Sequence, residues 1–247
     1  MKTWTKTLLI VALSLTAQAQ KVTWQQINTP DSSFVIAIDS SGDLLTSTCQ
    51  LRSGKTGLFS QLPLTNCTAM NEKNDVLSLS CEVYNYVTDT DKQLPAYGCT
   101  GINSTGTVVG YYGTWGKYQS FWFYHGQLPE KSYPNVALYG INDNGTFWGN
   151  RNSYYKAYSG FFVNASGPEV EIITHAIVAI NTSGSMILTD GYSFLVQSGI
   201  PTYVVFPSLA GITNGTSIDK WGNVAGWLSN GASFVRWVKC TPTIGCQ

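Results

Sequence analysis

The chain has 247 residues, and its 14 Lys and Arg residues balance 14 Asp and Glu residues to give a formal net charge of zero. Charged residues make up 11% of the chain and aromatic residues 13%, a composition that excludes an intrinsically disordered protein. Without a basic stripe, neither nucleic acid nor an anionic membrane surface is an expected partner.

The first 19 residues have the pattern of a secretory signal peptide. Two lysines precede an apolar run over residues 8–15, and the small-residue sequence Ala17-Gln18-Ala19 follows it. This order predicts cleavage after Ala19 and export of residues 20–247. No second long apolar stretch follows, so we expect a secreted, extracellular or periplasmic protein without a membrane span.

Six segments of nine residues in the rest of the chain align without gaps. They are AIDSSGDLL from Ala37, AMNEKNDVL from Ala69, GINSTGTVV from Gly101, GINDNGTFW from Gly140, AINTSGSMI from Ala179 and SIDKWGNVA from Ser217. The segments recur every 32 to 39 residues. Residues 20–247 are therefore predicted to form a single domain built from six copies of one structural unit.

Each copy has the residues of a tight β-hairpin. Its third position is Asp or Asn, which folds back onto the backbone of a type I turn, and three residues later comes Gly or Asn, which tolerates left-handed geometry. The first position is always small, as the crowded axis of a propeller requires. After the turn, adjacent apolar residues such as Val108 and Val109 predict a strand that is covered on both faces.

Further strands complete the predicted unit. A third strand recurs around Phe121, Phe161, Phe194 and Phe234, and a fourth is indicated at 169–174 and 201–206. The segment Val22 to Ile27 stands alone before the first repeat, where it can supply the outer strand of the last one. We therefore predict an all-β protein, a six-repeat β-propeller with about six small blades, in which the N-terminal strand closes the last blade.

The pattern GIN-x-x-G-x-V-V-G followed by a strand containing Phe resembles the bacterial extracellular HAF-type repeat family. It is clearest at Gly101 to Gly110 with Phe121, and at Gly140 to Gly149 with Phe161. In the four copies that keep the Phe, the His of the His-Ala-Phe triplet that names the family is replaced, by Gln119, Ser159, Tyr192 and Ala232. The resemblance implies export and a propeller-like fold, and it implies no activity.

Six cysteines are present, and the repeat limits how they pair. Cys49 and Cys81 occupy equivalent positions in the first two repeats, as do Cys67 and Cys99, which predicts the disulfides Cys49–Cys67 and Cys81–Cys99. Cys240 and Cys246 are then expected to form a local loop. We interpret all six as structural, since no C-x-x-C pair or His cluster suggests a metal or redox site.

No residue pattern points to catalysis. The two histidines, His125 and His175, have no Ser, Cys or carboxylate at a motif-like spacing, and no pair of acids is singled out. The glycine-rich turns do not lead from a strand into a helix, which argues against a phosphate-binding loop. The sequence therefore assigns no catalytic residue, no metal ligand and no cofactor, and it favours a protein that is not an enzyme.

Aromatic loops are the one feature open to a binding interpretation. They follow the second strand of the third and fourth repeats, and a further tryptophan lies inside the last turn. The candidate ligand-binding residues are Tyr112, Trp115, Tyr118, Tyr154, Tyr155, Tyr158 and Trp221. Such rings can stack on a sugar or hold a peptide, and adjacent blades would bring the loops to one face. The alternative is that the rings only cover blade edges.

Three functional hypotheses follow. The first is a secreted, monomeric, non-catalytic binding or surface-interaction protein whose partner is a glycan or an extracellular protein. The second is an extracellular hydrolase or lyase acting on polysaccharide, with its site at the mouth of the propeller channel. The third is a purely structural component of the cell envelope.

Overall fold

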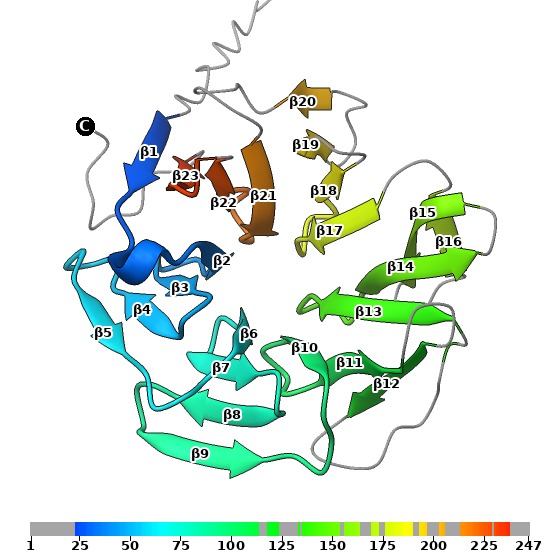
Figure 1. Ribbon diagram of the computed structural model, residues 1–247, viewed down its shortest axis with the longest axis horizontal. Helices are drawn as coiled ribbons and strands as arrows, with labels where there is room; N and C mark the ends of the chain where they lie inside the picture. The colour runs from blue at the N-terminus through cyan, green and yellow to red at the C-terminus, as the bar shows by residue number, and fades with distance from the viewer. Residues whose placement is uncertain are drawn as a thin grey trace, which may run out of the picture.

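The strands of the protein lie in small sheets arranged around a central axis (Figure 1). The computed structural model describes residues 23–113, 118–123, 133, 135–153, 156–163, 169–172, 176–189, 193–196, 203–205, 213–228 and 230–237. Five sheets have four strands each, and the sixth has three strands within these ranges. The predicted β-propeller is confirmed, and it differs from six equal blades in that only five have all four strands described.

The first three repeats form blades 1 to 3. Blade 1 consists of β2 (Val35–Ile38), β3 (Leu44–Thr46), β4 (Gln50–Arg52) and β5 (Phe59–Gln61). Blade 2 consists of β6 (Cys67–Met70), β7 (Asp75–Ser78), β8 (Glu82–Asn85) and β9 (Thr90–Gln93). Blade 3 consists of β10 (Cys99–Ile102), β11 (Val108–Tyr112) and β12 (Gln119–Phe123).

The next two repeats form blades 4 and 5. Blade 4 consists of β13 (Val136–Ile141), β14 (Phe147–Ser153), β15 (Lys156–Val163) and β16 (Glu169–Ile172). Blade 5 consists of β17 (Ala176–Ile180), β18 (Met186–Thr189), β19 (Ser193–Val196) and β20 (Tyr203–Val205).

Blade 6 joins the two ends of the described chain. It consists of β21 (Thr213–Ile218), β22 (Val224–Leu228), β23 (Ser233–Trp237) and the N-terminal β1 (Thr23–Ile27). Strand β1 pairs antiparallel with β23, with Thr23 opposite Trp237. A short 3-10 helix, η1 (Pro30–Ser32), then leads into blade 1. The predicted closure by the N-terminal strand is confirmed, and it covers the outer edge of β23.

The predicted hairpin turns are also confirmed. In blade 3 the Asn103 Oδ1 accepts hydrogen bonds from the backbone N–H groups of Thr105 at 3.1 Å and Thr107 at 2.9 Å. Gly106 has a φ of 79°, a left-handed conformation that favours glycine. The other copies repeat this arrangement, so Asp and Asn at the third position shape every inner turn.

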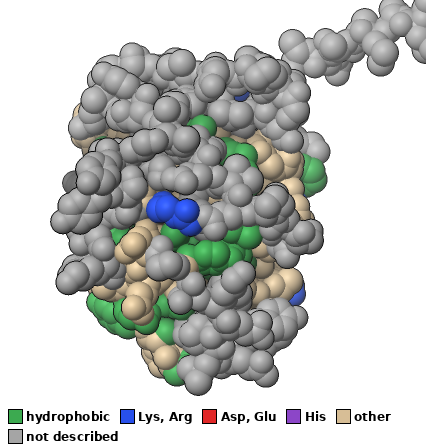
Figure 2. Space-filling model, turned by 90° about the vertical axis from the view of Figure 1, so that its right-hand side faces the viewer, with side chains coloured by type: hydrophobic (Ala, Val, Ile, Leu, Met, Phe, Trp, Pro, Cys, Tyr) green, Lys and Arg blue, Asp and Glu red, His purple; other side chains and the backbone are tan. Residues whose placement is uncertain are grey.

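The core lies between neighbouring blades. Leu45 of blade 1 packs with Val76 of blade 2, and Ile187 of blade 5 packs with Val224 of blade 6. Val108 and Val109 are both buried, as expected for a second strand with neighbours on both faces. On the outer side that carries β14 and β15, the described side chains in view are hydrophobic or uncharged apart from a small basic patch (Figure 2).

Two glycines explain the small first position of the repeat in different ways. A Cβ atom on Gly101 would lie 2.6 Å from the Cα of Gly140, so the inner strands of blades 3 and 4 approach too closely for a side chain there. At Gly140 itself the added atom would lie 2.2 Å from the Trp148 ring. The crowded axis therefore accounts for Gly101, whereas a neighbouring side chain accounts for Gly140.

A chain of side-chain hydrogen bonds links the inner turns of successive blades. Four asparagines each donate from Nδ2 to the backbone carbonyl of the equivalent residue in the next blade. The donors are Asn71 to Asn103 at 3.0 Å, Asn103 to Asn142 at 3.2 Å, Asn142 to Asn181 at 3.0 Å and Asn181 to Asp219 at 3.0 Å. The same side chain thus shapes its own turn and holds the next blade.

Both predicted repeat disulfides are present, and each joins two blades. Cys49, after β3, bonds to Cys67 at the start of β6, and Cys81, after β7, bonds to Cys99 at the start of β10. They connect blade 1 to blade 2 and blade 2 to blade 3. Cys240 and Cys246 lie outside the described residues. Within the described part of the chain, no helix is long and apolar enough to cross a membrane.

Replacing Asn181 with Ala should destabilise the protein by about 3 kcal/mol, because buried backbone groups would lose three hydrogen bonds at once. The matched control is Asn144→Ala, which removes one exposed interblade hydrogen bond and should cost less than about 1 kcal/mol. Equilibrium denaturation by urea measures both changes. Equal effects of the two substitutions would contradict a structural role for the buried amides.

Removing one disulfide, by replacing Cys49 and Cys67 with Ala, should lower the free energy of unfolding by roughly 3 kcal/mol, because the bond closes a loop of 18 residues. The Cys81→Ala/Cys99→Ala variant has the same loop length and serves as its internal comparison. Denaturation with and without reductant gives the values. An unchanged transition midpoint in both variants would show that the disulfides add no stability.

Candidate functional site

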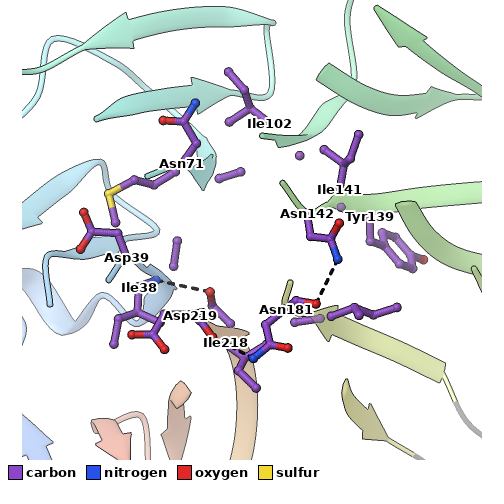
Figure 3. Close-up of a pocket in the computed structure, with 18 of the residues that line it drawn as sticks. Ile38, Asp39, Asn71, Ile102, Tyr139, Ile141, Asn142, Asn181, Ile218 and Asp219 are labelled. Atoms are coloured by element: carbon purple, nitrogen blue, oxygen red, sulfur yellow. Dashed lines mark hydrogen bonds between the residues drawn. The ribbon is translucent and has the colours of Figure 1, made fainter. Parts of the chain in front are cut away.

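The six inner strands surround a channel along the propeller axis (Figure 3). Its cavity has a volume of about 150 Å³ and is lined by residues of β2, β6, β10, β13, β17 and β21 together with their turns. At about 30 Å³ per water molecule, this space would hold only a few waters or one side chain. The channel is therefore too small to enclose a polysaccharide.

Each inner strand contains a β-bulge that the sequence did not predict. The pairing with the second strand shifts by one residue just before the small first position of the repeat. The extra residues are Ile36, Thr68, Thr100, Tyr139, Val178 and Thr216, and all of them line the channel. Bulges re-aim side chains, and here they bring one residue of each blade to the channel wall.

The inner turns gather at one end of the channel, which we call the turn face. Two buried carboxyl groups lie there, on Asp39 of blade 1 and Asp219 of blade 6 (Figure 3). Burial raises the pKa of each to about 7, and repulsion from Asp43 and Glu72 adds to the rise at Asp39. Lys220 lies 3.8 Å from Glu72.

The opposite end of the blades is the loop face, where each second strand leads into the third. A cluster of tyrosines lies there between blades 3 and 4. The ring centroid of Tyr111 is 5.2 Å from that of Tyr118 and 5.8 Å from that of Tyr139, both in edge-to-face contact. Tyr139 is 38% exposed, and burial raises the pKa of Tyr111. The bulge in β13 brings Tyr139 to both the channel and this cluster.

Further exposed aromatic residues continue around the loop face. Tyr112 is 53% exposed, stacks on Phe121 and donates its hydroxyl to Gln119. Tyr97 is 67% exposed and adjoins Gly98, whose carbonyl accepts the Tyr111 amide. These residues lie on the blade 2 side of the tyrosine cluster.

The loop face also carries an aromatic pair where blades 1 and 6 meet. Phe34, 41% exposed, precedes β2, and its ring centroid lies 5.9 Å from that of Trp227 at the end of β22. Among the described residues, four of the five exposed aromatic side chains are therefore on this face, namely Phe34, Tyr97, Tyr112 and Tyr139. A contiguous exposed apolar patch is typical of interaction surfaces, and the part of this face with contacts between rings is the tyrosine cluster of blades 3 and 4.

The fifth exposed aromatic residue, Trp221, is on the other side of the molecule. It lies in the turn between β21 and β22, is 45% exposed and has the Lys220 ammonium 5.2 Å from its ring. Trp221 is exposed as expected, but it lies on the turn face and does not join Tyr112 and Tyr118. The sequence shows which residues are in turns, whereas the end of the blade at which a turn lies follows from the fold.

The structure describes only part of the predicted ligand site. Trp115, Tyr154 and Tyr155 lie outside the described residues, and for Tyr158 only the backbone, in β15, is described. Tyr97 and Tyr139 join the predicted residues as new members. Neither could be found from the loop pattern, because Tyr97 precedes an inner strand and Tyr139 is a bulge residue within one.

The acidic groups that the described ranges bring together are those of the turn face, on Asp39, Asp43, Glu72 and Asp219. No set of three His, Cys, Asp or Glu residues in those ranges could hold a metal ion. His125 and His175 lie outside the described residues. The acidic groups at the turn face take backbone and tyrosine donors, as when Asp43 accepts the Tyr86 hydroxyl at 3.0 Å.

Comparison with known proteins supports the fold. No protein-family model matches the chain, and no curated protein matches it. Among solved structures, YCF48 bound to D1 peptide is similar with a TM-score of 0.55 and 12% identity, covering 88% of this chain and 97% of that one. The WD40 β-propeller domain of Doa1 has a TM-score of 0.52 and 11% identity, covering 87% and 97%. TolB from Acinetobacter baumannii has a TM-score of 0.51 and 10% identity, covering 83% and 62%. At these identities the likeness establishes a β-propeller and nothing finer.

Proposed function

We propose that this protein is a non-catalytic, exported binding protein that recognises an exposed segment of another protein through its loop face. The observation that carries the proposal is the concentration of exposed aromatic side chains on that face, next to the channel mouth. Tyrosine combines a large apolar ring with a hydroxyl that can bond to a peptide backbone, and it loses little conformational entropy when it is fixed.

The geometry of the rings favours a peptide over a sugar. The Tyr111 ring meets Tyr118 at 76° and Tyr139 at 86°, so these rings do not form one flat platform. One face of Tyr112 is covered by Phe121. Sugar rings stack on flat, open aromatic faces, whereas side chains of a peptide can fit between edges.

Two further observations support the proposal. YCF48, with which this chain shares its fold, is a propeller with a bound D1 peptide. The two disulfides fit an oxidising compartment, in agreement with the signal sequence predicted over residues 1–19.

Selection of peptides from a displayed random library tests the proposal. We expect the protein to enrich peptides whose affinity falls at least about tenfold when Tyr97, Tyr112 and Tyr139 are replaced with Ala, because aromatic anchors dominate such interfaces. The matched control replaces Leu58 and Val87, which are 73% and 67% exposed in loops of the turn face. It should change affinity less than about twofold.

A glycan array with the same proteins distinguishes a glycan partner from a protein partner. The proposal requires that no glycan binds in a tyrosine-dependent manner. Failure to enrich any peptide, equal losses in the two variants, or tyrosine-dependent binding of a glycan would each contradict a protein partner at the loop face.

A further inference from the structure

The chain of amide hydrogen bonds around the axis is interrupted at blade 1. Four of the six equivalent turn residues are asparagines, and each donates to the next blade. The other two, Asp39 and Asp219, carry carboxyl groups, which have no amide hydrogen to donate. Blade 1 is therefore the one blade without an amide link of this type on either side.

The repeat geometry shows where each carboxyl oxygen lies. Asp219 Oδ1 accepts the backbone N–H groups of Trp221 at 2.9 Å and Asn223 at 2.8 Å, as the asparagine Oδ1 does in the other copies. Its Oδ2 accepts the Asn223 side-chain amide at 2.8 Å. From the equivalence of the copies we infer that this oxygen takes the place of Nδ2, on the side of the Asp39 carbonyl, where a proton on it would be shared with the next blade. Asp39 Oδ1 likewise accepts the backbone N–H groups of Ser41 and Asp43, both at 2.9 Å, so the same equivalence assigns its Oδ2 to the side of the Asn71 carbonyl. An ionised carboxylate opposes one acceptor with another, whereas a protonated carboxyl supplies the missing donor.

The Asp39 side of this gap lies between blades 1 and 2, and the Asp219 side lies at the seam where the first and last repeats meet. Hydroxyl groups provide other links there: Ser217 Oγ accepts the Ile38 amide at 3.3 Å, and Thr216 Oγ1 donates to the Val35 carbonyl at 2.9 Å. The Val35 amide donates to Ser233 Oγ at 3.1 Å. These bonds hold the seam at any pH, so the two carboxyl groups add a contribution that depends on protonation.

We propose that Asp39 and Asp219 form a pH-controlled latch, in which the protonated carboxyl groups complete the ring of interblade hydrogen bonds and their ionisation opens it on both sides of blade 1. The latch tightens the propeller in a mildly acidic environment and loosens the seam above neutral pH.

The surroundings of the two groups agree with this assignment. Each aspartate is only 3% exposed, and burial raises the pKa of both to about 7. Asp43 at the end of the same turn and Glu72 of blade 2 repel a charge on Asp39, and Glu72 also repels one on Asp219. Tyr86 of blade 2 also faces the acids, and the one described cation nearby, Lys220, is 41% exposed and pairs with Glu72.

The sign of the effect follows from these pKa values. An aspartate pKa raised from 3.8 to about 7 in the folded state means that folding favours the protonated form. The stabilisation is complete below pH 4 and is lost as the pH rises toward 7 and above.

Urea denaturation of the mature protein between pH 5 and pH 8 tests the latch with the double variant Asp39→Asn/Asp219→Asn. The unfolding equilibrium constant of the original protein should rise between pH 5 and pH 8. Because asparagine supplies a permanent donor, the corresponding rise for the variant should be smaller by a factor of at least about ten. At pH 8 the variant should be the more stable of the two. The control Asp31→Asn/Asp91→Asn, at exposed positions, should keep the original pH dependence.

A second variant reverses the change. Asn142→Asp places a carboxyl group in an intact part of the ring and should add a loss of stability between pH 5 and pH 8. Carbon-13 NMR of the aspartate carboxyl groups gives a direct check, with titration of Asp39 and Asp219 expected near pH 7. Titration of both near pH 4, or equal pH dependence in the original protein and the double variant, would overturn the proposal.

Discussion

The hydrogen bond from an asparagine side chain in one inner turn to the backbone carbonyl of the next is the interaction on which the architecture depends. The same side chain uses its oxygen to shape its own hairpin and its amide to hold the neighbouring blade. A single blade cannot bury both faces of its second strand, so folding requires neighbours on each side. The turn residue therefore couples local hairpin formation to closure of the ring.

Because these side chains lie only in the inner turns, the two ends of the propeller differ. The turn face is fixed by buried turn residues that every copy needs, whereas the loop face is free to vary. Two disulfides reinforce the loops that follow β3 and β7, where the Cys49 and Cys81 backbones adopt positive φ values of 62° and 66°. In blade 3 the equivalent position is Gly113, which has a φ of 110° and no disulfide, and the exposed tyrosines gather beside it.

Much of the fold was predictable because the six copies of the repeat can be compared with one another, so that equivalent positions far apart in the sequence have the same structural role. Turn chemistry identified the hairpins, and symmetry between copies identified the cysteine pairs and the closing strand. The bulges were not predictable, since one extra residue in a strand leaves no mark in composition, and Tyr139 was missed for that reason. Trp221 was correctly placed in a turn, but only the fold shows that its turn lies opposite the tyrosine cluster.

Asp and Asn illustrate a second limit of sequence reasoning. As turn formers they are interchangeable, and the sequence treats all six copies alike. The two residues differ in the terminal atom that is not used in the turn, which is Nδ2 in Asn and Oδ2 in Asp. That difference matters only because of the group in the next blade that this atom faces. The signal peptide and the resemblance to the HAF-type repeat family stay predictions, because neither the described residues nor the comparisons bear on them.

Native-state hydrogen exchange tests the coupling of turns and blades most directly. In every blade the backbone amide four residues after the turn residue donates to its side chain, and these amides belong to Asp43, Asp75, Thr107, Thr146, Ser185 and Asn223. If the interblade hydrogen bonds join blades 2 to 6 into one cooperative unit, the amides of these five blades should exchange with the same free energy, equal to that of global unfolding. Blade-by-blade exchange with widely different free energies would contradict this account.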